Sequence, residues 1–183
     1  MTLETCEVKT PLGALTLFAD GSHLVGVEFG DKSKGKARLR RTLERAYGDF
    51  DVKRVKDPAG AATRLRRYFA GDAKALDDQP VRGHGTPFQQ AVWKALRAIP
   101  AGTTRSYGEL AKTIGRPSSV RAVGAANGAN PVAIFVPCHR IVASDGSAHG
   151  YGGGIARKEW LLEHEGARSG APSRAAKPRA VRS

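Results

Sequence analysis

The sequence predicts an α+β protein in two parts: an N-terminal antiparallel sheet with flanking helices, and a mainly helical C-terminal part. Apolar and polar residues alternate through the first thirty residues, as in half-buried strands. Residues 86–166 instead keep the spacing of amphipathic helices. Between these parts, residues 72–86 are rich in Asp, Gly and Pro, which is typical of a boundary. We therefore expect an N-terminal structural domain over 1–80 and a C-terminal domain over 86–166.

The N-terminal part is expected to begin with a three-stranded meander. The segments "LETCEVKT", "GALTLFAD" and "HLVGVEFG" are separated by the turn sequences "PLG" and "DGS". Residues 31–37 follow as a charged linker. The next apolar residues have helical spacing, which predicts helices over 38–48 and 58–71.

Three helices are predicted at the start of the C-terminal part. Thr86 is a candidate N-cap for "TPFQQAVWKALRAIPAG", and Ser106 with Glu109 fits the capping box that opens "SYGELAKTIG". A short break, "RPSS", then precedes the helix "VRAVGAANGAN". Two short helices joined by a tight turn suggest a helix-turn-helix, although many helical hairpins bind nothing.

The chain of 183 residues carries a formal net charge of +13, which favours a polyanionic partner such as nucleic acid or an acidic membrane face. Residues 167–183 contain five basic residues and no acidic one, so the charge without them is still +8. This basic tail lacks apolar periodicity and is expected to be disordered. No apolar run is long enough for a bilayer span or a signal peptide, so we expect a soluble, cytoplasmic protein that does not enter membranes.

The predicted helix "VRAVGAANGAN" carries small residues at positions where a helix that reads DNA bases carries long polar ones. Ala, Gly and Val dominate residues 120–130, and Arg121 and Asn127 are the main polar exceptions. If this helix docks on DNA, it should therefore bind with little sequence preference, and Arg121 should stand out as a contact. An equally consistent alternative is that the small residues pack against another helix.

A cysteine and a histidine stand together before a glycine-rich stretch. The segment "VAIFV", 132–136, is expected to be a short buried strand that ends at Cys138 and His139. Neighbouring side chains on an extended segment point to opposite sides, and no C-x-x-C or H-x-x-x-H partner is near, so a zinc site is disfavoured. The chain has only one other cysteine, Cys6, and a cytoplasmic setting disfavours a disulfide. A reactive thiol with His139 as its base is the favoured interpretation.

An imidazole that acts as a base needs a carboxylate to orient it. Three candidates lie on or just after the last predicted helix, "ARKEWLLEHEG", and their spacing selects none of them: Glu159, Glu163 and Glu165. A papain-like protease is disfavoured, because no second histidine or asparagine context accompanies the pair. The residues alone indicate a basic protein with a helical hairpin for DNA and a reactive cysteine.

The segments "SYGELAKTIGRPSSVRAVGAANGANPVAIFVPCHRIV" and "GYGGGIARKEWLLEHEG" resemble the 6-O-alkylguanine-DNA alkyltransferases, also called methylated-DNA–protein-cysteine methyltransferases. The motif P-C-H-R-[VI] carries the resemblance, with R-A-V-G-x-A-N-G-x-N-P upstream and K-E-W-L-L-x-H-E-G downstream. It implies a ribonuclease H-like N-terminal domain and a single-use DNA-repair enzyme. Such an enzyme binds double-stranded DNA in the minor groove without sequence preference, flips the damaged base, and takes the alkyl group from 6-O-alkylguanine or 4-O-alkylthymine.

The resemblance assigns roles to five residues by motif position. Cys138 would accept the alkyl group, His139 would act as base through a water, and Glu165 would be the carboxylate behind it. Asn130 would hold the turn before the cysteine. Tyr107 would assist flipping at the phosphate and donate a proton or hydrogen bond to the guanine ring.

The resemblance also implies residues at the DNA and around the base. Arg121 would fill the gap left by the flipped base. The other residues expected at the DNA are Ala122, Gly124, Ala125, Asn127 and Arg140, and those expected to wall the substrate pocket are Tyr151, Gly152, Gly153 and Ile141. Many relatives have serine where this chain has Gly152, so a hydroxyl contact is lost here, and we hypothesise that bulkier adducts fit.

The transfer leaves a thioether that nothing in the sequence would cleave, so one use per molecule, no cofactor and a monomer are expected, and cooperative binding on DNA stays open. Some relatives carry a structural zinc, but Cys6, His23 and His84 are irregularly spaced and lack an evident fourth ligand, so no metal is predicted.

Two other functions are considered as alternatives to alkyl transfer. A non-catalytic sensor of alkylated guanine is disfavoured because Cys138 is retained. A transcriptional regulator is disfavoured by the small-residue helix and by the lack of an evident dimerisation segment.

Overall fold

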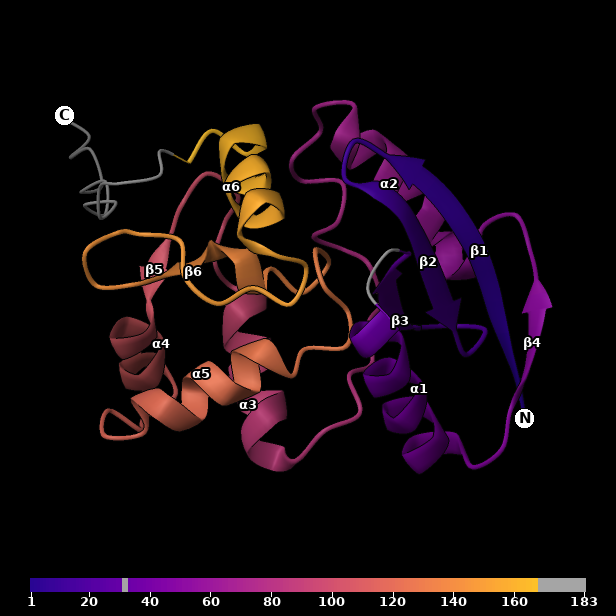
Figure 1. Ribbon diagram of the computed structural model, residues 1–183, viewed down its shortest axis with the longest axis horizontal. Coiled ribbons are helices and arrows are strands. Elements are labelled where there is room, and N and C mark those ends of the chain that lie inside the picture. Colours follow the sequence, from indigo (N-terminus) through magenta and orange to yellow (C-terminus); the bar gives the residue numbers. More distant parts are fainter. Residues whose placement is uncertain (31–32, 168–183) are drawn as a thin grey trace, which may run out of the picture.

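The computed structural model describes residues 1–30 and 33–167, except for the side chains of residues 33–35. Nearly all of the expected disordered tail lies outside the described residues. Its first residue, Ala167, is buried against Val142 and Leu162. The N-terminal sheet and its helices lie beside the helical C-terminal part (Figure 1). No helix within the described ranges has the length and apolarity needed to cross a membrane.

The N-terminal sheet has four strands in the order β3-β2-β1-β4. The antiparallel meander expected from the sequence is present as β1 (Thr2–Thr10), β2 (Gly13–Ala19) and β3 (Leu24–Phe29). The sequence analysis missed β4 (Asp51–Arg54), which pairs with β1 in parallel, so the sheet is mixed. All residues of β4 are exposed, so it lacks the apolar alternation that reveals a strand in a sequence.

Two helices cover opposite faces of this sheet. Leu17 and Phe18 point to opposite faces because they are neighbours on one strand. Phe18 packs into the small core formed with α1 (Ser33–Tyr47), whereas Leu17 belongs to the main core, which includes α2 (Ala61–Phe69). The helix α1 begins inside the segment expected to be a linker. The helix α2 lies where it was predicted and follows the 3₁₀ turn η1 (Pro58–Gly60).

The predicted helices of the C-terminal part are all present: α3 (Pro87–Arg97), α4 (Tyr107–Thr113), α5 (Val120–Gly128) and α6 (Ile155–His164). Both predicted N-caps are confirmed, since Thr86 accepts a hydrogen bond from the Gln89 N–H and Ser106 accepts one from the Glu109 N–H. The helices α4 and α5 form the expected hairpin, with α3 packed beside them (Figure 1). Two short strands, β5 (Arg105–Ser106) and β6 (Ile141–Val142), pair in parallel.

Residues 132–136 do not form the strand that the sequence analysis expected. Ile134 has a φ of 75°, and the Val136 N–H donates to the Val132 carbonyl, so the segment is a tight turn. Cys138–Arg140 then form the 3₁₀ turn η2. The segment is apolar because it is buried, and burial alone does not distinguish a strand from a packed turn. The argument that Cys138 and His139 diverge along an extended chain therefore does not apply.

Candidate active site

Cys138 opens η2 and is 6% exposed. Asn130 holds the turn before it from both ends. Its Oδ1 accepts the Val132 N–H at 2.9 Å, and its Nδ2 donates to the Val136 carbonyl at 2.8 Å. The Val136 carbonyl also accepts the Cys138 N–H at 2.8 Å. These bonds satisfy backbone groups that no sheet satisfies, and they fix the position of the thiol.

Burial raises the pKa of the Cys138 thiol, while the side chain of Asn130 and the positive charges of Lys158 and Arg38 act in the opposite direction. The net direction is upward, so the thiol is protonated at neutral pH in the protein without DNA. A base is needed before it can act as a nucleophile.

His139 lies directly against a carboxylate. Its Nε2 is 2.9 Å from Oε1 of Glu165, and both side chains are 0% exposed. An ionised carboxylate only accepts hydrogen bonds, so the imidazole proton lies on Nε2 and Nδ1 is the basic nitrogen. Among the described residues, Nδ1 has no hydrogen-bond partner. Burial lowers the pKa of His139 and its bond to Glu165 opposes this, so the imidazole is neutral at pH 7.

Arg140 and Tyr68 complete the surroundings of Glu165. Arg140 donates from Nε to Oε2 and from Nη2 to Oε1, both at 2.9 Å, and the Tyr68 hydroxyl donates to Oε1 at 2.8 Å. Burial favours the neutral acid, but the hydrogen bonds from His139 and Arg140 and the positive charge of Arg140 dominate and hold the pKa of Glu165 well below its usual value. Glu165 is therefore ionised. The other two candidates, Glu159 and Glu163, are exposed.

This network corrects one expectation, since Arg140 was expected at the DNA. Its side chain is buried, bound to Glu165 and to the carbonyl of Ile99, so it is not available to a phosphate. Arginine is exposed in most proteins, and its burial here depends on a carboxylate 25 residues away in the sequence.

Lys158 is a buried cation that the sequence analysis did not select. Its side chain is fully buried and Nζ donates to the His149 carbonyl at 2.6 Å. Burial lowers the pKa of Lys158 to about 8, although the nearby Cys138 acts to raise it. A signal was present in the sequence: Lys158 on α6 and Glu165, the residue directly after this helix, are seven residues apart and continue the face that carries Leu161 and Leu162.

A cavity next to Cys138 is lined by residues of both parts of the chain. Tyr151, Gly152 and Gly153 line it as expected, but Ile141 does not, because it is fully buried in β6. A Cβ on Gly153 would lie 2.7 Å from the Tyr151 ring and 3.0 Å from the Phe29 ring, so only glycine fits. The sequence analysis missed the residues that the N-terminal part contributes to this wall: Val27, Glu28, Phe29, Arg38, Leu39 and Thr42.

Comparison with known proteins agrees with this arrangement. Residues 7–82 match the family model "6-O-methylguanine DNA methyltransferase, ribonuclease-like domain", and residues 87–167 match "6-O-methylguanine DNA methyltransferase, DNA binding domain". A methylated-DNA–protein-cysteine methyltransferase of Shigella flexneri is 45% identical over 163 residues, which are 87% of this chain and 94% of the relative. The chain belongs to this methyltransferase family. The predicted family and enzyme class are thereby confirmed.

Two further relatives support the assignment. The methylated-DNA–protein-cysteine methyltransferase of Mycobacterium bovis is 46% identical over 165 residues, 88% of this chain and 92% of that one. The crystal structure of Mycobacterium tuberculosis OGT in complex with DNA has a TM-score of 0.72 and 41% identity, and covers 94% of this chain and 96% of that one. Both relatives span the two parts of this methyltransferase, so the predicted α+β fold with its helical C-terminal part is confirmed as well.

In this methyltransferase the hairpin presents small residues outward. Three of the exposed residues of α5 are Arg121, Ala122 and Ala125. Gly124 is half-buried, and a Cβ added to it would lie 3.8 Å from the Tyr107 ring. Asn127 was expected at the DNA, but it is buried and its Nδ2 donates to the Cys138 carbonyl at 3.4 Å. Asn127 therefore supports the cysteine turn, and the outward face of α5 has Arg121 as its long polar side chain.

Tyr107 joins the hairpin to the loop over the cavity. It opens α4, is half-buried, and donates its hydroxyl to the His149 carbonyl at 3.4 Å. Burial raises the pKa of Tyr107, and the nearby Cys138 adds to this. Since Lys158 donates to the same carbonyl, Tyr107 and Lys158 both fix the loop that leads to Tyr151.

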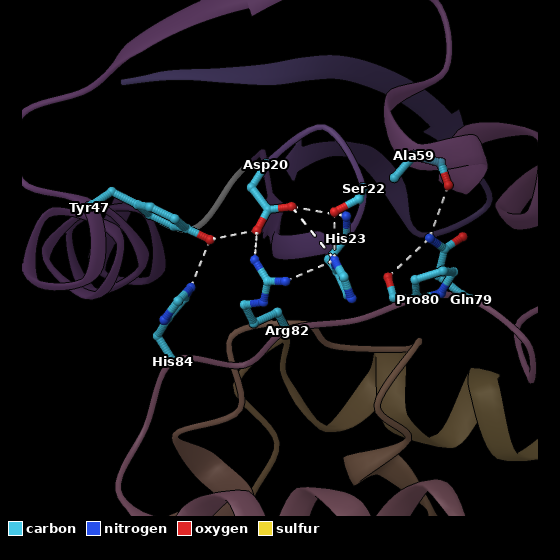
Figure 2. A network of polar contacts seen from close by, with 9 residues as sticks. All are labelled: Asp20, Ser22, His23, Tyr47, Ala59, Gln79, Pro80, Arg82 and His84. Atoms are coloured by element: carbon cyan, nitrogen blue, oxygen red, sulfur yellow. Dashed lines mark hydrogen bonds and ion pairs between the residues drawn. The ribbon is translucent and has the colours of Figure 1, made fainter.

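The residues considered as zinc ligands are engaged elsewhere. His84 Nε2 lies 2.7 Å from the Tyr47 hydroxyl, and His23 Nδ1 lies 3.1 Å from Nη2 of Arg82 (Figure 2). Cys6 is half-buried on β1. Within the described part of the chain, no three His, Cys, Asp or Glu side chains are grouped as metal ligands.

Proposed function

We propose that this protein repairs DNA by transferring an alkyl group from the 6-O position of guanine to Sγ of Cys138, once per molecule. The observation that carries the proposal is the position of Cys138, which lines the cavity and is adjacent in sequence to the buried His139–Glu165 pair. A single nucleophile next to a neutral base with a fixed carboxylate is the arrangement that thiol activation requires.

In the proposed reaction the thiol proton passes through a water to Nδ1 of His139. The thiolate attacks the alkyl carbon, a C–S bond forms, the C–O bond breaks, and its electron pair goes to the guanine oxygen. The guanine ring then gains a proton, and Tyr107, which lies beside the cavity loop, is the proposed donor. Glu165 is ionised and bound to Nε2, so it stabilises the imidazolium that forms.

Double-stranded DNA is the proposed partner, bound in the minor groove with the damaged base flipped into the cavity. The small outward side chains of α5 allow the helix to approach the groove closely while making few sequence-specific contacts to bases. Arg121 is proposed to fill the gap that the flipped base leaves in the base stack. The division into a structural domain over 1–80 and a DNA-binding, alkyl-accepting domain over 86–166 belongs to this proposal. Activity on 4-O-alkylthymine, a monomeric state and a cytoplasmic location remain predictions.

The test is the intact-protein mass after incubation with a duplex that contains 6-O-methylguanine. We expect one methyl group per molecule on the wild type and on Cys6→Ala, which keeps the proposed acceptor. Cys138→Ala should gain none. Tight binding of the lesion without a mass change would overturn the proposal and favour a non-catalytic sensor of alkylated guanine.

Gly152 affects the size of the alkyl group that the cavity can accept. It is exposed at the edge of the cavity, and a Cβ there would lie 3.9 Å from Nη2 of Arg38. We propose that the missing side chain leaves room for a bulky adduct. Gly152→Ser should then slow transfer from benzylguanine more than transfer from methylguanine, and an unchanged ratio of the two rates would contradict this.

A further inference from the structure

The carboxylate behind His139 is held by a residue from the N-terminal part of the chain. Tyr68 lies on α2, is 0% exposed, and donates its hydroxyl to Oε1 of Glu165 at 2.8 Å. The same oxygen accepts Nε2 of His139 and Nη2 of Arg140, each at 2.9 Å. Three donors thus share one oxygen, and only one of them comes from the N-terminal part.

The direction of the Tyr68 hydrogen bond is fixed by chemistry. An ionised carboxylate has no proton to donate, so the phenol must be the donor. Burial raises the pKa of Tyr68, and the charge of Glu165 raises it further, so the hydroxyl keeps its proton at neutral pH. A third donor on Oε1 takes up negative charge that would otherwise stabilise a proton on His139.

We infer that Tyr68 is a positioning residue of the transfer reaction, which fixes the orientation of Glu165 and limits the basicity of His139. The inference rests on the proposed function, because it concerns the base of that reaction. It gives the N-terminal part a role in the chemistry in addition to its share of the cavity wall.

Other ionisable groups near the pair act on His139 as well. The ones that interact with His139 or Glu165 are Arg140 of η2, Lys158 of α6, Tyr151 of the cavity loop and Tyr68 of α2, and His164 of α6 packs against the Tyr68 ring. Arg140 and Lys158 both lower the pKa of His139 through their positive charge, whereas Glu165 raises it. Tyr68 acts by weakening the effect of Glu165.

Tyr68 can be changed without disturbing its ring. The ring packs edge-on against Phe69 and His164, with centroids 5.2 Å and 5.0 Å away. His164 also donates from Nε2 to the Tyr68 carbonyl at 2.8 Å, a bond that does not depend on the side chain at position 68. Tyr68→Phe therefore keeps these contacts and removes only the hydroxyl.

The experiment measures the titration of His139 by NMR in protein labelled at histidine, without DNA. Tyr68→Phe should raise the pKa of His139 by roughly half a pH unit to one pH unit, because Glu165 loses a competing donor. In single-turnover methyl transfer, the acidic limb of the pH–rate profile should move upward by the same amount, and the rates should converge at alkaline pH.

The matched control is Tyr47→Phe. It removes a half-buried hydroxyl that lies away from the cavity and donates to Asp20 at 3.0 Å. This substitution should leave the titration of His139 unchanged. An unchanged pKa in Tyr68→Phe would overturn the inference, and so would a rate lowered by one factor at every pH. If the wild type transfers no methyl group, the proposed function fails, while the DNA-free titration still decides whether Tyr68 limits the basicity of His139.

Discussion

Two polar junctions join the N-terminal part to later segments of the chain, and each is built from one carboxylate, one tyrosine, one arginine and one histidine. The linker junction consists of Asp20, Tyr47, Arg82 and His84, with His23 beside them (Figure 2). The active-site junction consists of Glu165, Tyr68, Arg140 and His139. In each, one carboxylate accepts hydrogen bonds from a tyrosine and an arginine. The Arg82 side chain is 47% exposed, whereas that of Arg140 is 5% exposed.

The difference shows that surroundings, not residue types, decide what such a network does. At the linker junction the Asp20 side chain is 2% exposed, but water reaches the guanidinium of Arg82 and can replace its contacts, so those contacts contribute little to stability. At the active-site junction, a lost partner leaves a buried charge without compensation. A buried network is therefore costly to disturb, and it is also where a proton can be held at a defined atom for chemistry.

The largest expected effect comes from Glu165→Gln, which keeps the shape of the side chain and removes its charge. Arg140 would then be a buried cation without a counterion, and the free energy of unfolding should fall by about 3–5 kcal/mol. Urea unfolding measures the change. The control is Glu163→Gln, an exposed position two residues away on the same segment, where the change should be within about 0.5 kcal/mol. Equal losses in the two variants would show that removing the buried charge of the active-site junction costs no more than removing an exposed one.

Residues of the active-site junction also show how far the sequence alone could lead. Among Glu159, Glu163 and Glu165, only Glu165, directly after α6, continues the buried face that carries Leu161 and Leu162, so the helical spacing already indicated the correct carboxylate. The spacing argument overlooked it, and the family resemblance supplied the choice. The local signals at helix starts, such as Thr86 with Gln89, predicted the structure well because the capping contacts are three residues apart.

Other features depend on distant residues and could not be predicted from local patterns. Arg140 contacts a carboxylate far along the chain, and the N-terminal part of the sequence does not indicate that Tyr68 reaches Glu165, 97 residues away. The turn over residues 132–136 has the composition of a buried strand, and its shape depends on the amide of Asn130. The strand β4 is exposed throughout and is defined only by its pairing with β1.

A smaller effect is expected from Asp20→Asn at the linker junction. Burial acts to raise the pKa of Asp20, but hydrogen bonds from the His23 N–H and the Tyr47 hydroxyl, together with the charge of Arg82, leave it lowered. A lowered pKa means that the carboxylate stabilises the fold above its unfolded-state pKa, near 3.9, and that this contribution is lost as the pH falls through the folded-state value.

Asp20→Asn should therefore cost about 1–2 kcal/mol at pH 7 and progressively less below about pH 4. Unfolding by urea at a series of pH values measures the difference from the wild type. The penalty of Glu165→Gln should persist to lower pH, because the pKa of Glu165 is held much further below its usual value. If the two penalties vanish over the same pH range, the carboxylates are in equivalent surroundings and the comparison fails.

The smallest effect should come from Arg82→Ala. Its guanidinium donates to Asp20 and to Nδ1 of His23, but its backbone N–H donates to the Leu24 carbonyl and is unaffected by the substitution. Because nearly half of the side chain is exposed, we expect a loss of less than about 1 kcal/mol. Salt should reduce the loss further, since ions screen exposed charges on the scale of about 10 Å at 0.1 M. Urea unfolding at low and high NaCl concentration measures both. A loss above about 2 kcal/mol that salt does not change would mean that the linker junction excludes water as the active-site junction does.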